Sequence, residues 1–213
     1  MTQQRTVTVL LERHGTTYAA QAGITVKDTP SPLYRLLVLS LLLSARISGE
    51  IAVRAARELS AAGFRTPRRM ADATWQQRVD ALGRAGYRRY DERTATMLGD
   101  GADILLERYR GDLRRLRAEA DGARSLHSAV QQFPGIGKVG ASIFCREVQA
   151  AWPSLAPYLD QKVLDGAQRL GLPTNPRRLA RLVDDADLPR LAAGCVRAAL
   201  DDEVVRDVRD HAS

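Results

Sequence analysis

Apolar residues recur every three or four positions along most of the chain, and this spacing predicts helices. One such set is Ile51, Ala55, Leu59 and Ala62. Alternating runs of β-branched residues, which indicate strands, are almost absent. The one short candidate, residues 6–10, is better interpreted as part of a helix. We therefore predict an all-α fold.

Polar residues and glycines at the ends of the apolar runs predict where helices begin and end. The predicted N-caps are Ser48, Thr74 (with Gln77 in a capping box), Asp91, Asn175 and Asp187. Gly63 and Gly86 are predicted to end the first two of these helices. Residues 33–47 are apolar on most of the helix circumference, which predicts a central, buried helix.

The stretch Trp-Pro-Ser-Leu-Ala-Pro at residues 152–157 breaks regular structure, which predicts a domain crossing or a strap between helices. The longest apolar run, residues 36–43, is too short to cross a bilayer. The N-terminus shows no basic segment followed by an apolar one, as a secretory signal would. We expect a cytoplasmic protein without a membrane partner, associated with the nucleoid if the source is prokaryotic.

Basic residues exceed acidic ones by 32 to 25, which gives a net charge of +7, and nearly all of the basic residues are arginine. The forked guanidinium suits phosphate oxygens, so the composition favours a polyanionic partner. A GC-rich genome, which encodes Arg in place of Lys, explains the same composition. Cys145 and Cys195 are too few for a disulfide framework and lie among apolar residues, so we expect buried free thiols. The three histidines are scattered and predict no metal site.

Residues 133–141, Phe-Pro-Gly-Ile-Gly-Lys-Val-Gly-Ala, are the most informative stretch. Gly135 and Gly137 permit a tight turn whose N–H groups point outward at the start of a helix, where an anion is favoured. Ile136 is expected to pack between the flanking helices, and Lys138 to reach a phosphate. Such a turn holds a DNA backbone without reading its sequence. The alternative is an ordinary turn between two helices that happens to contain glycines.

The stretch resembles the helix-hairpin-helix motif of the endonuclease III and base-excision glycosylase superfamily. In that family an aspartate at the start of a helix follows the hairpin, and Asp160 stands at the matching position. Leu-Leu-Leu-Ser-Ala-Arg at residues 41–46 resembles the family's Leu-Leu-Ser-Ala-Gln element. Leu-Gly-Arg-Ala-Gly-Tyr at residues 82–87 resembles its Gly-Leu-Tyr turn. The matches occur in the family's order, from about residue 30 to residue 171.

The resemblance implies two helical domains with a DNA-binding cleft. One would be a six-helix barrel over residues 31–150, with the helix-hairpin-helix at about residues 125–147. The other would be built from residues 1–30 and 151–213. The implied partner is double-stranded DNA with a damaged or mismatched base, and we expect a monomer.

Departures from the family pattern favour a monofunctional enzyme. Bifunctional members carry a Schiff-base lysine where this chain has Val139, and endonuclease III has a four-cysteine iron–sulfur loop that this chain lacks. Monofunctional thymine/uracil mismatch glycosylases are the closest local match. They share the Arg-x-Ser-Gly element of residues 46–49 and the Asp-x-Lys turn of residues 160–162. We expect no cofactor and no iron–sulfur cluster, and leave open only a monovalent cation at the hairpin.

The resemblance assigns a role to each site residue. Asp160 would be the catalytic carboxylate that stabilises an oxocarbenium-like transition state, although an aspartate there also suits an N-cap. Arg46 would fill the gap left by the flipped nucleotide, and Tyr87 would be the neighbouring wedge. The alternatives are a surface arginine at the end of a helix for Arg46 and an aromatic residue packed under a turn for Tyr87. The expected DNA-binding residues are Gly135, Ile136, Gly137, Lys138, Val139, Gly140, Arg46 and Tyr87. The expected pocket residues are Tyr158, Gln161 and Lys162.

Two other functions are compatible with the sequence. A bifunctional glycosylase and abasic-site lyase would use Lys138 or Lys162 in place of the missing lysine. A DNA-structure-binding protein without activity would use Asp160 only as a helix cap. The residues that select the base are not evident, and the polar cluster Tyr90-Asp91-Glu92 has no assigned role.

Overall fold

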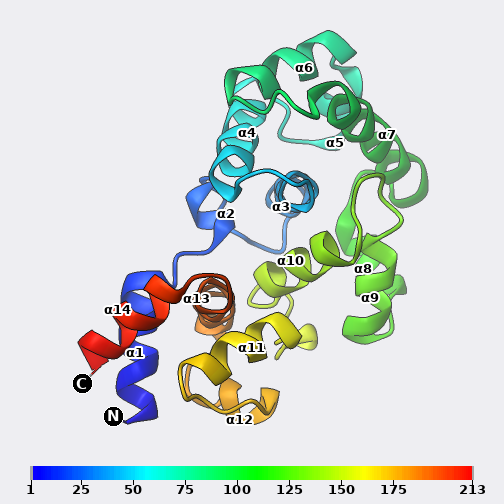
Figure 1. Ribbon diagram of the computed structural model, residues 1–213. Coiled ribbons are helices and arrows are strands. Elements are labelled where there is room, and N and C mark those ends of the chain that lie inside the picture. Colours follow the sequence, from blue (N-terminus) through cyan, green and yellow to red (C-terminus); the bar gives the residue numbers. More distant parts are fainter. Residues whose placement is uncertain (1, 213) are drawn as a thin grey trace. The chain divides into compact units, whose positions relative to one another are not determined.

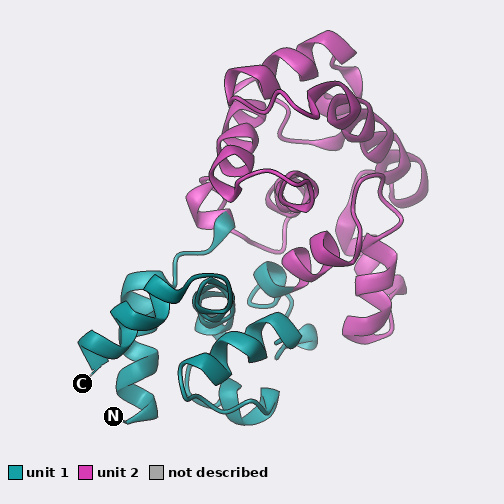
Figure 2. Ribbon diagram, in the orientation of Figure 1, with its two compact units in different colours: residues 1–18, 146–213 teal, residues 19–145 magenta. Residues whose placement is uncertain are grey.

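The computed structural model describes residues 2–212, and all regular secondary structure in that range is helical (Figure 1). The all-α prediction is therefore confirmed. The chain forms two compact units (Figure 2). Unit 2 is the central segment, residues 19–145, and unit 1 combines the residues up to 18 with those from 146 onward.

The unit boundaries differ from the predicted ones, which followed residues 30 and 150. Residues 19–30 belong to unit 2 because its arginines hold them there. Arg57 donates a hydrogen bond from Nε to the carbonyl of Gln21 (2.7 Å), and Arg35 donates one from Nη2 to the carbonyl of Gly23 (3.0 Å). At the other boundary, Gln149 is hydrogen-bonded to the backbone of Tyr158, which ties residues 146–150 to unit 1.

Unit 2 wholly contains seven helices. They are α3 (Pro30–Ser44), α4 (Gly49–Ala61), α5 (Pro67–Asp72), α6 (Trp75–Arg84), α7 (Asp91–Tyr109), α8 (Leu113–Glu119) and α9 (Gly122–Val130). The predicted central helix is α3, which is buried along most of its length and packs against α4 and α8. It ends at Ser44, three residues earlier than predicted, because Ala45 adopts an extended backbone.

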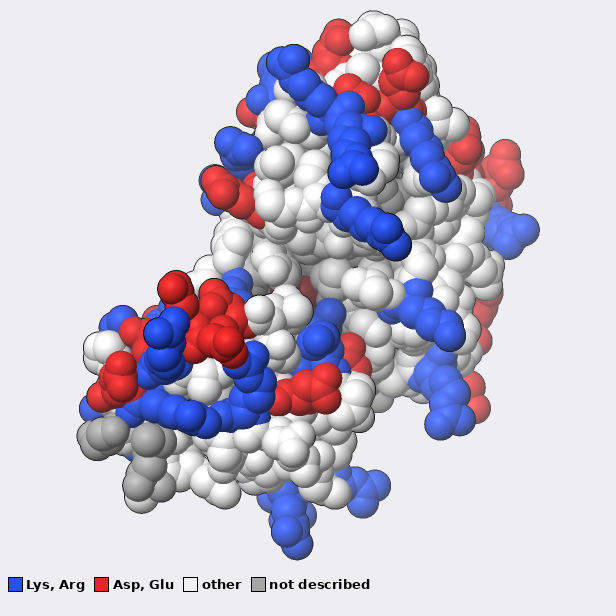
Figure 3. Space-filling view, viewed as in Figure 1, with Lys and Arg blue, Asp and Glu red and all other residues white. Residues whose placement is uncertain are grey.

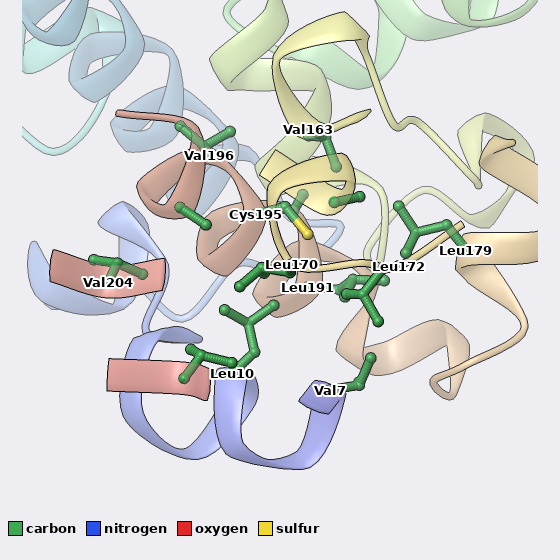
Figure 4. Close-up of a cluster of buried hydrophobic side chains, with 14 of the residues drawn as sticks. Val7, Leu10, Val163, Leu170, Leu172, Leu179, Leu191, Cys195, Val196 and Val204 are labelled. Atoms are coloured by element: carbon green, nitrogen blue, oxygen red, sulfur yellow. The ribbon is translucent and has the colours of Figure 1, made fainter. Parts of the chain in front are cut away.

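Unit 1 is organised around α13 (Leu188–Leu200), which packs against the other long helices of the unit. Those are α1 (Gln3–His14), α11 (Gln161–Arg169) and α14 (Asp202–Ala212). The apolar core between them includes Leu10, Val163 and Leu191 (Figure 4). Cys195 lies in the same core, where burial raises the pKa of its thiol to about 12. Both cysteines are buried and free, as predicted.

The remaining elements are short or span a boundary. They are α2 (Tyr18–Gln21), α10 (Lys138–Val148), α12 (Pro176–Ala180) and the 3₁₀ turns η1 (Pro153–Leu155) and η2 (Asp185–Asp187). η1 lies in the predicted break at residues 152–157, which leads into α11 without a further α-helix.

Three of the five predicted N-caps bind the backbone as expected. The side chains of Ser48, Thr74 and Asn175 each accept an N–H from the third residue of their helix, and Thr74 forms the full capping box with Gln77. The Asp91 prediction is wrong, because α7 already begins at Asp91, and Tyr90 is the N-cap residue. Asp187 does occupy an N-cap position, but its carboxylate pairs with Arg190 (2.8 Å) and caps no N–H.

Gly166 sets how closely α11 approaches α13. A Cβ at this position would overlap the carbonyl oxygen of Cys195, whereas a Cβ on the helical Gly83 would meet no atom within 4 Å. Gly166→Ala is therefore expected to lower the free energy of unfolding by about 1–3 kcal/mol, the usual cost of overpacking. Gly83→Ala, by contrast, should raise it by up to about 1 kcal/mol through helix propensity. Urea denaturation of both variants checks this, and an unchanged Gly166→Ala midpoint would contradict the packing.

Asp207 joins α14 to the end of α1. Its carboxylate accepts two hydrogen bonds from Arg13 (2.6 Å each) and lies 2.7 Å from His14 Nε2. The hydrogen bonds from Arg13, followed by that from His14, hold the pKa of Asp207 well below its ordinary value. A depressed carboxylate pKa stabilises the fold above the ordinary value, and that stability is lost as the pH falls toward the folded-state pKa.

Asp207→Asn is therefore expected to unfold at a lower temperature than the wild type at pH 7. The difference should shrink as the pH falls below about 4, where the unfolded carboxyl group takes up its proton. Thermal unfolding followed by circular dichroism across this pH range measures the effect. Asp210→Asn, an exposed position on the same helix, is the matched control. Equal behaviour of the two variants would show that the contacts of Asp207 with Arg13 and His14 add no stability.

Candidate functional site

The hairpin between α9 and α10 has a backbone that requires glycine at one position. Gly135 has φ +82°, and a Cβ there would lie 2.6 Å from Met97 Sδ. The N–H of Ile136 donates to the carbonyl of Phe133 (3.1 Å), and both of these side chains are buried beneath the turn. The side chain of Ile136 is therefore buried, which agrees with its expected packing but leaves it little surface for the DNA contact that was also expected.

The outer side of the hairpin is open. A Cβ on Gly137 would meet no atom within 4 Å, and its φ is not positive, so the backbone does not require glycine there. Lys138 is exposed at the first position of α10, and Val139 is 63% exposed. The first N–H groups of a helix have no partner within the helix. The hairpin thus offers backbone donors and one ammonium group on an unobstructed surface.

Gly140 has a packing role that corrects its predicted DNA contact. It is buried, and a Cβ there would overlap Ser44 Oγ and lie 3.1 Å from the carbonyl oxygen of Ser40. α10 therefore lies against α3 at this point. Gly140 supports the hairpin from behind and does not face outward.

A hollow of about 250 Å³ lies beside the hairpin within unit 2. Its lining residues are Leu41, Ser44, Ala45, Arg46, Tyr87, Tyr90, Arg93, Thr94, Met97 and Gly135. Arg46 follows the end of α3 and is exposed, so the structure brings the predicted gap-filling residue next to the hairpin. The lining also includes two arginines, Arg46 and Arg93.

Tyr87 does not fit the predicted wedge. Its side chain has 0% exposure, and its hydroxyl lies 3.5 Å from Thr94 Oγ1. Burial raises its pKa. A side chain with no exposed surface cannot enter a base stack without leaving its packing site, so we assign Tyr87 to the support of the turn.

Tyr90 and Arg93 were not predicted as site residues. Tyr90 is the N-cap residue of α7 and Arg93 lies in the first turn of that helix, and both line the hollow. Arg89 lies over the Tyr90 ring, with 5.3 Å from its Cζ to the ring centroid. The sequence shows that Tyr90 and Arg93 are three positions apart, but it does not show that they line the same hollow as Arg46.

Unit 2 carries exposed basic side chains. On the face shown in Figure 3, Lys and Arg side chains project from the middle of unit 2, whereas Asp and Glu side chains lie mainly toward its edges. Such a distribution favours a polyanion by long-range attraction that salt weakens.

Asp160 lies in unit 1 as the N-cap of α11. Its Oδ1 accepts the N–H of Val163 (3.2 Å), and its Oδ2 lies 3.7 Å from Nε of Arg146. The side chains of Asp160 and Arg146 are 21% and 12% exposed, so the carboxylate is partly shielded but still reachable. The cap that the sequence indicated is therefore present, and it leaves Oδ2 facing a cation.

The predicted pocket residues around Asp160 have different environments. Tyr158 is half-buried, and its backbone N–H and carbonyl are both hydrogen-bonded to Gln149. Gln161 is exposed, and its amide donates to Asp165 Oδ1 (2.9 Å) on the same helix. Lys162 is exposed. Sequence reasoning missed Arg146 and Gln149, because nothing in their local pattern marks them as neighbours of Asp160.

Within residues 2–212, no group of three or more His, Cys, Asp or Glu side chains is arranged to hold a metal ion. None of the helices described there combines the length and apolarity that a membrane crossing needs.

No protein-family model matches the chain, and no curated protein matches it. Two solved structures have a similar fold. The first is a trapped endonuclease III–DNA covalent intermediate, an estranged-adenine complex; it is 15% identical, with 92% of this chain and 86% of that chain covered and a TM-score of 0.50. The second is a non-covalent endonuclease III–DNA complex; it is 16% identical, with the same coverage of both chains and a TM-score of 0.49. The first likeness confirms the predicted endonuclease III-like, helix-hairpin-helix fold.

Proposed function

We propose that this protein is a monofunctional DNA glycosylase, which hydrolyses the bond between deoxyribose and a damaged or mismatched base in duplex DNA. The observation that carries the proposal is the placement of Asp160. A partly exposed carboxylate caps the helix that follows a helix-hairpin-helix, in a fold like that of endonuclease III.

Asp160 supplies the chemistry that the reaction needs. Departure of the base leaves positive charge on the sugar, in a transition state that resembles an oxocarbenium ion. A fixed carboxylate near C1′ stabilises that charge and can accept a proton from the attacking water. The water oxygen bonds to C1′, and the base leaves with the electron pair of the broken C–N bond and takes up a proton.

The hairpin and the hollow beside it support DNA as the partner. The open backbone donors around Gly137, together with Lys138, suit phosphate oxygens. Arg46 is long, exposed and next to the hairpin, as a side chain that fills the gap of a flipped nucleotide must be. Arg93 and Tyr90 add a second arginine and an aromatic ring to the lining of the same hollow.

The exposed side chain of Val139 supports the monofunctional assignment. The resemblance places the Schiff-base lysine of bifunctional members at this position, and a valine cannot form a Schiff base. Lys138 is adjacent and Lys162 follows Asp160 by two positions, and both are exposed. These two lysines define the lyase alternative, and their substitution tests it.

The test is a panel of duplexes, each with one lesion or mismatch, in which free base and strand cleavage are measured separately. Uracil or thymine opposite guanine is the first substrate to try, given the local resemblance. We expect base release without strand cleavage and without a borohydride-trapped adduct. A trapped adduct that disappears in Lys138→Ala or Lys162→Ala would establish the lyase. Binding without release of any base would favour the DNA-structure-binding alternative.

A further inference from the structure

The last turn of α10 and the residue that follows it hold the segment that carries Asp160. The guanidinium of Arg146 faces Asp160 Oδ2 at 3.7 Å, with both side chains largely buried. This pairing lies within unit 1, since both residues follow position 145. Oδ1 is already engaged by the N–H of Val163. Each oxygen of the carboxylate therefore has its own partner.

Gln149 fixes the backbone just before Asp160. Its side chain is buried, at 1% exposure. Oε1 accepts the N–H of Tyr158 (2.9 Å), and Nε2 donates to the carbonyls of Tyr158 (3.3 Å) and Arg146 (2.9 Å). The Gln149 amide thus binds both the N–H and the carbonyl of Tyr158, as a neighbouring β-strand would. Tyr158 lies two positions before Asp160.

We infer that Arg146 and Gln149 are positioning residues for the catalytic carboxylate: Gln149 fixes the main chain that leads to Asp160, and Arg146 fixes the orientation of its Oδ2. The inference rests on the proposed function, because it assigns to these contacts a role in the rate of base release and not only in the fold.

The physical reason lies in the freedom of an aspartate side chain. Its terminal torsion has a broad energy minimum, so one hydrogen bond to Oδ1 does not define where Oδ2 points. A partly buried cation on the Oδ2 side removes that freedom, and burial limits screening by salt. Misplacement of a reacting group by about 1 Å can cost about a hundredfold in rate. Small rotations of the carboxylate are therefore sufficient to matter.

Arg146→Ala is expected to lower the single-turnover rate of base release by about tenfold to a hundredfold. Affinity for an abasic-site duplex should stay within about threefold, because the guanidinium is engaged with Asp160 and contributes little to phosphate binding. Arg146→Lys, which restores a cation, should recover most of the rate. Arg177→Ala is the matched control, since it removes one exposed arginine from the same unit.

A double-mutant cycle separates positioning from a general effect. In an Asp160→Asn background the carboxylate charge is already gone, so Arg146→Ala should cause no further loss of rate. Gln149→Met, similar in volume, should slow release by a comparable factor in the wild-type background. If Gln149→Met fails to fold, because it removes the two hydrogen bonds to the Tyr158 backbone, the Arg146 series still decides whether the carboxylate is positioned from this segment.

The outcomes are distinguishable. A wild type that releases no base from any duplex would overturn both the proposed function and this inference. An active wild type whose Arg146→Ala variant keeps its rate within twofold would overturn the inference alone. A parallel fall of rate and DNA affinity in Arg146→Ala would also overturn the inference, since Arg146 would then be a phosphate contact. So would a further loss of rate when Arg146→Ala is added to Asp160→Asn.

Discussion

Asn in place of Asp160 is expected to slow base release by about a hundredfold or more, the usual loss when a positioned electrostatic stabiliser is removed. The variant should fold normally. The amide oxygen of Asn can still accept the N–H of Val163, and Asn is as good an N-cap as Asp. What disappears is the negative charge beside the developing sugar cation. Single-turnover release of free base measures the loss, and affinity for an abasic-site duplex should stay within a few-fold.

Asp165→Asn is the matched control for that experiment. It makes the same change of charge on the same helix, where the carboxylate accepts a hydrogen bond from Gln161. Its rate should equal that of the wild type within about twofold, because this carboxylate is bound to Gln161 on the same helix and does not cap α11. Full activity of Asp160→Asn would exclude Asp160 as the catalytic carboxylate and would leave it as a helix cap only.

Local signals explain what the sequence predicted well. A cap depends on residues three positions apart, so Ser48, Thr74 and Asn175 could be identified without any knowledge of tertiary structure. The hairpin is local too, since its turn requires a left-handed residue at Gly135 and a buried residue at Ile136. Asp91 failed because an aspartate suits the first turn of a helix as well as its cap.

Long-range contacts explain the features that the sequence did not predict. Gly140 looks like a third hairpin glycine, but the reason for it is Ser44 on a helix far earlier in the chain. Tyr87 lies in a turn that resembles a DNA-contacting element, yet the packing around it, including Thr94, buries it completely. Arg146 is one of many arginines in the sequence, and only the fold selects it as the neighbour of Asp160. Composition and period carry no information on such pairings.

Gly137→Leu is expected to weaken binding to all duplexes by about tenfold or more, regardless of sequence. Its backbone tolerates a side chain, since φ is not positive and a Cβ meets no neighbour, so the fold should persist. The leucine would instead occupy the space in which a phosphate approaches the hairpin N–H groups. Loss of one or two charge-assisted hydrogen bonds costs about 1.5–3 kcal/mol each, and 1.4 kcal/mol is tenfold in affinity.

The salt dependence of binding distinguishes a lost phosphate contact from a misfolded protein. Each phosphate neutralised by Lys or Arg contributes about 0.9 to the slope of log affinity against log salt. Gly137→Leu should reduce that slope by about one such contact, because a phosphate kept away from the hairpin also loses Lys138. Gly83→Leu is the control for adding a side chain at an open glycine, because a Cβ on Gly83 also meets no atom within 4 Å and Gly83 lies within α6 and not in the hairpin. If Gly137→Leu binds DNA with the affinity and salt slope of Gly83→Leu, phosphates do not approach the hairpin, and the DNA-binding surface must lie elsewhere on the protein.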